Sequence, residues 1–258
     1  MNEVISGIFS NESRFGRAMT RAGIIIAANL MFVLFSLPLV TTGAALAALY
    51  HVMLKTLRGN GVLNPFRAFW TGFRTNFKPA TLVWLAALAF AALVWADLRI
   101  TAAAGGAVSA LRYPIYALCI VLGVLLAYFF PTLSAFDAPI PGLLRNSFFF
   151  AIRKPWKTLI ILFFDVFPLY LTYSDPQFAP LYAFIWFFFG FGAIAMIGSA
   201  LLLPEFRPYL DPVDAEGDFL YDEEGNRIRA GAERVSPTVG APQKSEKKIL
   251  EEMKKLGM

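Results

Sequence analysis

The chain has 258 residues, of which 57% are apolar, 16% are aromatic and only 16% are charged, with a formal net charge of +5. A soluble domain of this length carries about a quarter charged residues. Several apolar runs here approach the roughly 20 residues that cross a bilayer, so the totals exclude an ordinary soluble protein. One cysteine, Cys119, and one histidine, His51, also exclude an intramolecular disulfide and a Cys/His metal cage.

The apolar residues gather in five runs. We predict an all-α fold, a polytopic bundle of transmembrane helices, because a backbone in lipid must satisfy its own hydrogen bonds. The bundle covers residues 22–205. An amphipathic lead-in (1–21) precedes it, and a polar, mildly acidic tail (206–258) follows and ends in a short predicted helix. The apolar runs are 22–54, 80–96, 115–131, 159–173 and 180–203.

The first run decides the number of spans. From Ala22 to Leu54 it has 33 residues without Lys, Arg, Asp or Glu. As one helix it would be about 50 Å long, against a hydrocarbon core of about 30 Å. Pro38 ends or kinks a helix, and Thr42 followed by Gly43 resembles an N-cap that opens a new helix. A turn here gives six spans, whereas one kinked passage gives five.

The basic residues beside the spans separate these two arrangements. With six spans, twelve of them face one side and two, Arg99 and Arg112, face the other; with five spans they divide nine to five. Since basic residues accumulate in cytoplasmic loops, we predict six spans in the cytoplasmic membrane, with both termini cytoplasmic. We expect no nucleic-acid binding. The twelve are Arg14, Arg17, Arg21, Lys55, Arg58, Arg67, Arg74, Lys78, Arg145, Arg153, Lys154 and Lys157.

Two basic segments between spans are predicted to be amphipathic cytoplasmic arms. In the first, 64–77, Asn64 can cap and Pro65 can start a helix with an aromatic stripe and a basic face. Such a helix lies flat at the headgroup boundary or docks on a partner. In the second arm, which begins at about residue 140, we expect Asp137 to cap the N-terminus of a helix and Pro141 to start it. The candidate partner-binding residues are Arg67, Trp70, Arg74, Arg145 and Lys154.

The two arms also resemble each other. Each has an early proline, about a dozen aromatic-rich residues, and then a Lys-Pro pair, Lys78-Pro79 or Lys154-Pro155, before the next span. This suggests a duplicated unit of span, arm and span. Chance similarity between two interfacial segments is the alternative.

The sequence carries no catalytic, cofactor-binding or metal-binding pattern. It has no Walker A, G-x-G-x-x-G or H-E-x-x-H motif. Neither His51 nor Cys119 has the local signature of a catalytic residue. We therefore expect no enzyme activity, no cofactor and no bound metal.

Three polar residues inside the spans are candidate functional residues. Asp165 falls near the middle of LIILFFDVFPLYLTY, Asn29 lies in the first span, and His51 lies near the inner end of the second. Ionisable residues in a membrane usually face the bundle interior or water. They form either a polar path that contacts substrate or hydrogen bonds that lock helix packing. Asp97 and Glu205, near span ends, need no special role.

Four segments of the chain resemble the YesL family of bacterial membrane proteins. SLPLVTTGAALAALY is the most specific, and FWTGFRTNFKPATLVWL, YFFPTLSAFD and LLRNSFFFAIRKPWKTL are similar in composition. The resemblance covers about residues 15–175. The resemblance implies a role in sugar uptake, since genes of this family lie beside those of carbohydrate ABC importers and polysaccharide-degrading enzymes. It implies no catalytic residues.

We therefore expect a non-catalytic accessory component of a carbohydrate ABC import system. Its expected partners are the lipid bilayer and the importer's membrane or ATPase subunits, and a carbohydrate is a candidate ligand. The alternative is a self-contained transporter or channel for a small solute such as a sugar, with Asp165 and Asn29 lining the path. A transporter should have a polar cavity at mid-membrane. An accessory subunit should have a dry interior and a partner-facing surface.

Overall fold

The structure, a computed structural model, describes residues 14–59, 64–104, 110 and 112–210. Over these ranges the chain is helical and forms no strand. Six segments are long and apolar enough to cross a membrane, judged by length and composition. The predicted all-helical fold with six candidate spans is therefore confirmed. Most of the lead-in and the tail beyond residue 210, with its predicted terminal helix, lie outside the described residues.

The first apolar run folds as two helices, as the six-span arrangement requires. α2 (Arg14–Ser36) ends before Pro38, a 3-10 turn η1 (Leu39–Thr41) follows, and α3 (Thr42–Arg58) packs back against α2. Because α2 begins at residue 14, the described end of the predicted lead-in is continuous with the first span.

The threonine hydroxyl groups of the turn do not cap α3 as predicted. Thr42 is the first residue of α3 and not its N-cap, and the N-cap residue, Thr41, makes no side-chain capping bond. Instead the Thr41 hydroxyl donates to the carbonyl oxygens of Phe35, at 2.6 Å, and Pro38, at 2.9 Å. The threonine therefore stabilises the end of α2 rather than the start of α3, because the last carbonyls of a helix lack partners within it.

The helix after this hairpin is unusually long. α4 (Pro65–Ala104) has 40 residues, about 60 Å at 1.5 Å per residue. As predicted, Asn64 caps it, because its Oδ1 accepts from the backbone N–H of Arg67 at 3.0 Å. The first arm is not a separate helix, however, because α4 continues through Pro79 into the apolar segment. Membrane helices tolerate an internal proline when neighbouring groups satisfy the freed backbone.

α3 packs antiparallel along the first half of α4, and two glycines allow this close approach. A Cβ added to Gly43 would meet the side chain of Trp84 and lie 2.8 Å from the carbonyl oxygen of Ala80. A Cβ added to Gly72 would lie 2.8 Å from Cβ of His51. Small residues at such contacts are the usual way in which membrane helices pack closely.

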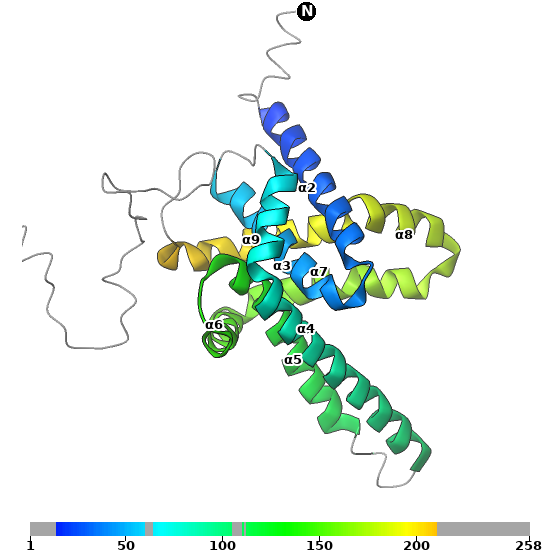
Figure 1. The fold of residues 1–258 in the computed structure, drawn as a ribbon. Coiled ribbons are helices and arrows are strands. Elements are labelled where there is room, and N and C mark those ends of the chain that lie inside the picture. The colour runs from blue at the N-terminus through cyan, green and yellow to red at the C-terminus, as the bar shows by residue number, and fades with distance from the viewer. Residues whose placement is uncertain (1–13, 60–63, 105–109, 111, 211–258) are drawn as a thin grey trace, which may run out of the picture.

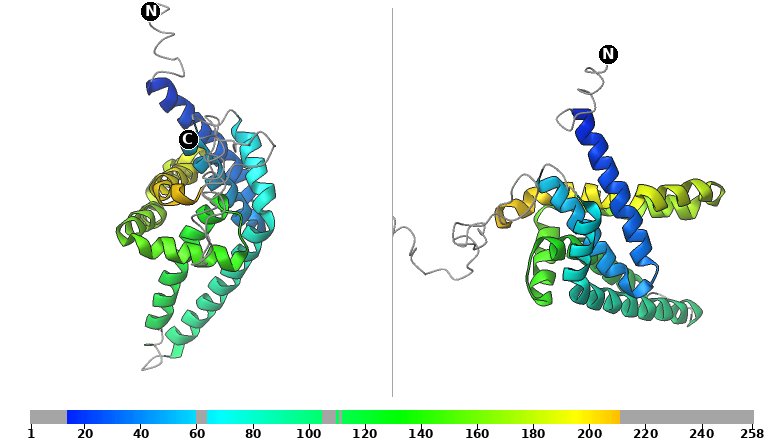
Figure 2. Two further views of the ribbon diagram at one scale, coloured as in Figure 1. Left: turned by 90° about the vertical axis from the view of Figure 1, so that its left-hand side faces the viewer. Right: turned by 45° about the horizontal axis from the view of Figure 1, so that its top comes forward.

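α5 (Arg112–Ala135) runs back along the second half of α4. The rings of Trp84 and Phe130 lie 6.3 Å apart where the two helices meet the rest of the molecule. Beyond that point the α4–α5 hairpin protrudes alone (Figures 1 and 2). At its inner end, the Ser134 hydroxyl donates to the carbonyl oxygen of Ala47 in α3 at 2.7 Å.

The second arm is a helix of its own, α6 (Ile140–Arg153). The predicted cap by Asp137 is wrong, since Pro139 occupies the N-cap position without a side-chain capping bond. α7 (Pro155–Ser174) begins two residues after α6 ends, at a backbone break on Lys154 with φ −138° and ψ 81°.

The two Lys-Pro pairs therefore occupy different structural positions. Pro79 lies inside a continuous helix, whereas Pro155 is the first residue of one. The arms differ accordingly, one being the start of a span and the other a separate helix. Chance similarity accounts for this better than a duplicated unit does.

The last apolar run is irregular. It contains the 3-10 turn η3 (Pro176–Phe178), α8 (Ala179–Ile185), the π-helical segment η4 (Trp186–Gly190), and α9 (Phe191–Phe206), before the 3-10 turn η5 (Arg207–Tyr209). α7 and α8 form a second protruding hairpin, which diverges from the α4–α5 hairpin (Figure 1).

The buried core lies at the base from which both hairpins extend. α2, α3, the first half of α4, the inner end of α5 and α9 contribute to it, with α3 almost wholly enclosed. A second cluster around Phe206 joins α5, α6, α7 and α9. The far halves of the hairpins expose large apolar side chains such as Trp95 and Tyr173. Such surfaces suit contact with lipid.

Candidate functional site

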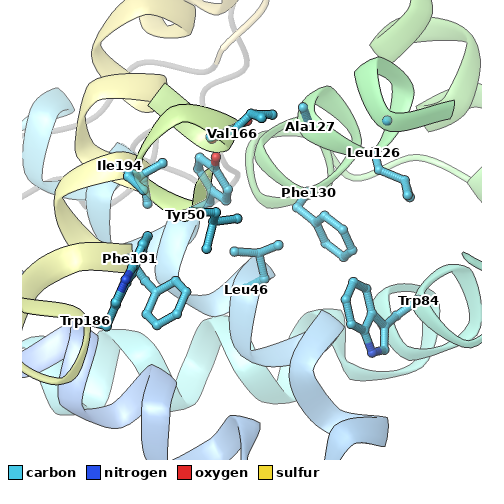
Figure 3. A pocket seen from close by; sticks show the side chains of 14 residues that line it. Leu46, Tyr50, Trp84, Leu126, Ala127, Phe130, Val166, Trp186, Phe191 and Ile194 are labelled. Carbon is cyan, nitrogen blue, oxygen red and sulfur yellow. The ribbon is translucent and has the colours of Figure 1, made fainter. Parts of the chain in front are cut away.

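A cavity of about 440 Å³ lies where the two hairpins meet α3 (Figure 3). α3, α4, α5, α7, η4 and α9 supply its walls. Trp84 and Phe130 form one side, Trp186 and Phe191 form the opposite side, and Tyr50 of α3 lies between them. The volume falls in the range of about 300–1,000 Å³ typical of small-molecule sites.

Both cavity tryptophans have their ring N–H groups engaged. Trp84 Nε1 donates to the carbonyl oxygen of Leu39 at 2.8 Å, and Trp186 Nε1 donates to Thr172 Oγ1 at 2.9 Å. Trp186 also lies 4.6 Å, between ring centroids, from Phe191. The indole rings are therefore held in place, and a ligand would meet their aromatic surfaces rather than free N–H donors.

Two polar side chains line the cavity, Tyr50 on α3 and Asp165 on α7. Tyr50 is buried beside Gly198 of α9, where an added Cβ would lie 3.4 Å from the phenol oxygen. Asp165 is half-buried. Across the part of the chain that the structure describes, its carboxylate has no hydrogen-bond or ion-pair partner. The cavity thus combines aromatic walls with one unpaired acid.

Asn29 lies outside this cavity and joins α2 to η4. Its amide nitrogen donates to the carbonyl oxygens of Trp186, at 3.0 Å, and Phe187, at 2.7 Å. Its amide oxygen accepts from the backbone N–H of Gly192 at 2.8 Å. Where a π-helical turn interrupts an α-helix the hydrogen-bonding register changes. Here Asn29 supplies partners to three backbone groups and so fixes the backbone of the cavity wall.

His51 also lies away from the cavity lining. It neighbours Tyr50 in sequence, but its side chain packs on Gly72 of α4. Of the three intramembrane residues that the sequence singles out, the structure therefore places only Asp165 at the cavity. Asn29 and His51 connect helices.

The five candidate partner-binding residues are all exposed. Arg67, Trp70 and Arg74 lie on the first half of α4, Arg145 lies on α6, and Lys154 lies between α6 and α7.

The aromatic stripe of the first arm is divided between the protein interior and the surface. Phe69 and Phe73 are buried and pack against Phe35 of α2, with ring centroids 5.8 and 5.0 Å apart. Phe66 and Trp70 remain exposed. The inner half of the stripe thus fixes α4 on the bundle.

Lys154 belongs to an ion cluster that the sequence interpretation missed. Glu205, to which no special role was assigned, is buried near the end of α9 and pairs with Lys154 at 2.6 Å and Lys157 at 2.8 Å. Arg153 lies 3.9 Å from its other oxygen. Lys157 also donates to the carbonyl oxygen of Leu201 at 2.8 Å. One carboxylate therefore holds the start of α7 against the end of α9.

Some of these residues could have been found from sequence and others could not. A tight hairpin brings the start of one span beside the end of the next, so Glu205 could have been matched with the basic residues at 153–157. Tyr50, Trp84 and Trp186 carry no such signal in a chain that is 16% aromatic.

Comparison with known proteins agrees with the resemblance noted in the sequence. A family model described as "Protein of unknown function, DUF624" matches residues 25–98. A protein of Bacillus subtilis (strain 168) named "Uncharacterized protein YesL" is 30% identical over 136 residues. Both matches support a YesL-like family. The aligned region covers 52% of this chain and 64% of that relative, which is less than two thirds of its length. No solved structure matches the chain.

Proposed function

We propose that this protein is a non-catalytic integral membrane protein and an accessory component of a carbohydrate ABC import system. It would lie in the bacterial cytoplasmic membrane, with both termini cytoplasmic and the tips of the two hairpins outside. The six candidate spans support membrane insertion. The resemblance to the YesL family supports the import system.

The observation that carries the docking role is the exposed basic face on the first half of α4. Arg67 and Arg74 are exposed and, among the described residues, form no ion pair. Burial of Phe69 and Phe73 holds the same helix segment on the bundle. Guanidinium groups presented on a fixed helix suit bidentate contacts with carboxylates. Trp70, exposed between them, is of the residue type that often anchors interfaces.

A self-contained transporter for a small solute such as a sugar is the second candidate. Asp165 at the wall of a cavity between the spans favours it. The other lining residues, Tyr50 apart, are apolar or aromatic, and Asn29 does not line the cavity. A sugar has many hydroxyl groups, each of which costs free energy when buried without a hydrogen-bond partner. The accessory role is therefore the better supported of the two.

Co-purification tests the accessory role. We expect the tagged wild-type protein, extracted from native membranes in mild detergent, to retain importer membrane or ATPase subunits. The double variant Arg67→Glu/Arg74→Glu should lose them, because both reversed charges would repel an acidic partner. Arg99→Glu/Arg112→Glu, at the other end of α4 and the start of α5, is the matched control and should retain them.

Two results would contradict the accessory role. One is wild-type protein that carries no importer subunit, and the other is a complex unchanged by the α4 double variant. Sugar uptake by liposomes that contain the purified protein alone would instead favour the transporter.

A further inference from the structure

We propose that the cavity between α3, α5, α7 and α9 binds a lipophilic organic cation, with Asp165 as its counter-ion and the surrounding aromatic rings as its walls. This inference does not depend on the importer, because the purified chain alone carries every residue that it requires. It assigns a ligand class to a cavity that the docking role leaves unused.

The first argument is the missing partner of Asp165. An acid within a membrane bundle is costly unless it pairs with a cation or hydrogen-bond donors. Across residues 14–59, 64–104 and 112–210, no group of the chain fills that role. The nearest lysine along α7, Lys157, is about 12 Å away along the helix axis, and its ammonium is engaged by Glu205 and Leu201. A cationic ligand would supply the compensating charge that the described residues lack.

The second argument is the chemistry of the walls. Trp84, Phe130, Trp186 and Phe191 surround the space, with Tyr50 between them (Figure 3). Aromatic rings attract cations placed over their faces, and the attraction strengthens where water is excluded. Both indole N–H groups are already bonded within the protein. The site therefore offers apolar contact, aromatic faces and one negative charge, which fits a cation with apolar substituents.

The third argument is access from the lipid phase. Residues of α4 and α5 in one hairpin and of α7 in the other line the cavity, and the two hairpins diverge from each other (Figures 1 and 2). Val166 and Leu169, two lining residues on α7, are more than half exposed. A ligand dissolved in the bilayer could thus enter sideways between the hairpins. A lipophilic cation partitions into a bilayer, whereas a polyhydroxylated solute does not.

Binding of tetraphenylphosphonium to the purified full-length protein tests this assignment. We expect saturable binding by calorimetry in a non-ionic detergent, with one cation per chain. Asp165→Asn should weaken the binding at least about tenfold, since tenfold corresponds to about 1.4 kcal/mol and one close charge pair near a protein surface is worth more. Asp165→Glu should retain binding, and Asp97→Asn, which removes an exposed acid of α4 outside the cavity lining, should leave it unchanged.

Two further measurements separate a charged site from an apolar one and locate the site in this cavity. Triphenylphosphine oxide, an uncharged aromatic probe, should bind more weakly and should not respond to Asp165→Asn. Gly123→Leu should abolish binding of both probes without unfolding the protein, because Gly123 lines the cavity and an added Cβ there meets nothing within 4 Å. This variant keeps the test decisive if Asp165→Asn fails to fold.

Three outcomes would overturn the assignment. They are the absence of saturable cation binding, equal binding of the charged and uncharged probes, and undiminished cation binding by folded Asp165→Asn. None of these results would affect the importer association, which the co-purification measures separately.

Discussion

Lys157 Nζ lies 2.8 Å from Glu205 Oε1, and both side chains are more than nine-tenths buried where α7 begins and α9 ends. Lys154 contacts the same oxygen at 2.6 Å, and Lys157 also bonds the carbonyl oxygen of Leu201. A buried carboxylate shared by two ammonium groups thus ties α7 to α9, through two residues, Lys157 and Glu205, that are 48 positions apart in sequence. Removal of the negative charge of Glu205 and removal of the positive charge of Lys157 should therefore affect stability to different extents.

Glu205→Gln should destabilise the protein. It leaves Lys157 buried without a counter-charge, and breaking a buried pair in this way costs about 3–5 kcal/mol. Lys154 and Arg153 are about half exposed, and solvent screens their interaction with Glu205. We therefore expect the free energy of unfolding to fall by less, about 1–3 kcal/mol. In a domain of this size, each kcal/mol of lost stability lowers Tm by roughly 2–4 °C. Thermal unfolding in detergent measures this change.

Lys157→Met is the informative companion to Glu205→Gln. It should cost less, because Glu205 keeps Lys154 as a partner. Lys78→Met, at an exposed position of α4, is the control and should change Tm little. Equal stability of Glu205→Gln and wild type would show that the cluster does not hold α7 on α9.

The second prediction concerns Asn29. Asn29→Leu conserves size but removes the side-chain hydrogen bonds to three backbone groups of η4 and α9, among them the carbonyl oxygen of Trp186. Interhelical hydrogen bonds in membranes are worth about 0.6–2 kcal/mol each, so a loss of about 2–4 kcal/mol in the free energy of unfolding is expected. Asn76→Leu is the matched control, because the Asn76 amide, as far as the described residues go, bonds Gly72 alone, within its own helix. Similar losses for both variants would count against this role.

Several residues show which parts of the structure could be predicted from the sequence. Apolar run lengths, a break between Pro38 and Gly43 and the Asn64 cap could be predicted, because they depend on local chemistry. Asp165 was identified because an acid in an apolar run is conspicuous. The bonds of Asn29 could not be predicted, since they depend on a π-helical segment 157 residues away. The continuity of α4 through Pro79 was missed because packing against α3 overrides the local preference.

The third prediction tests the close contact of α3 and α4. Gly43→Ala should destabilise the hairpin, because the new methyl group would meet Trp84 and the carbonyl oxygen of Ala80 in a helix that cannot move freely. Overpacking of this kind typically costs about 1–3 kcal/mol. Gly23→Ala introduces the same methyl group where nothing lies within 4 Å, so thermal unfolding of this variant should match wild type. A stable Gly43→Ala would mean that the helices separate without cost.

The last prediction concerns the depth of the α2–α3 turn. Trp84 Nε1 bonds the carbonyl oxygen of Leu39, which places the turn beside the middle of α4. α4 continues from Trp84 to Ala104 for about 30 Å beyond the turn. Its uncharged stretch, 79–96, is about 27 Å long and matches the hydrocarbon core. With the proposed orientation, Trp84 lies near the cytoplasmic end of that stretch. The turn should then end inside the bilayer, although α2 and α3 are apolar enough to cross it.

Single cysteines in a Cys119→Ala background measure this depth. With both termini cytoplasmic, an impermeant maleimide should label Ser174→Cys, at the α7–α8 tip, from outside and the exposed Thr75→Cys only after the membrane is opened. Val40→Cys should resist both treatments and react with a lipid-soluble reagent, because the turn exposes apolar side chains, Leu37 and Leu39 among them, that suit lipid. Labelling of Val40→Cys from outside as fast as Ser174→Cys would show instead that α2 and α3 cross completely. Outside labelling of Thr75→Cys would reverse the orientation of the whole bundle.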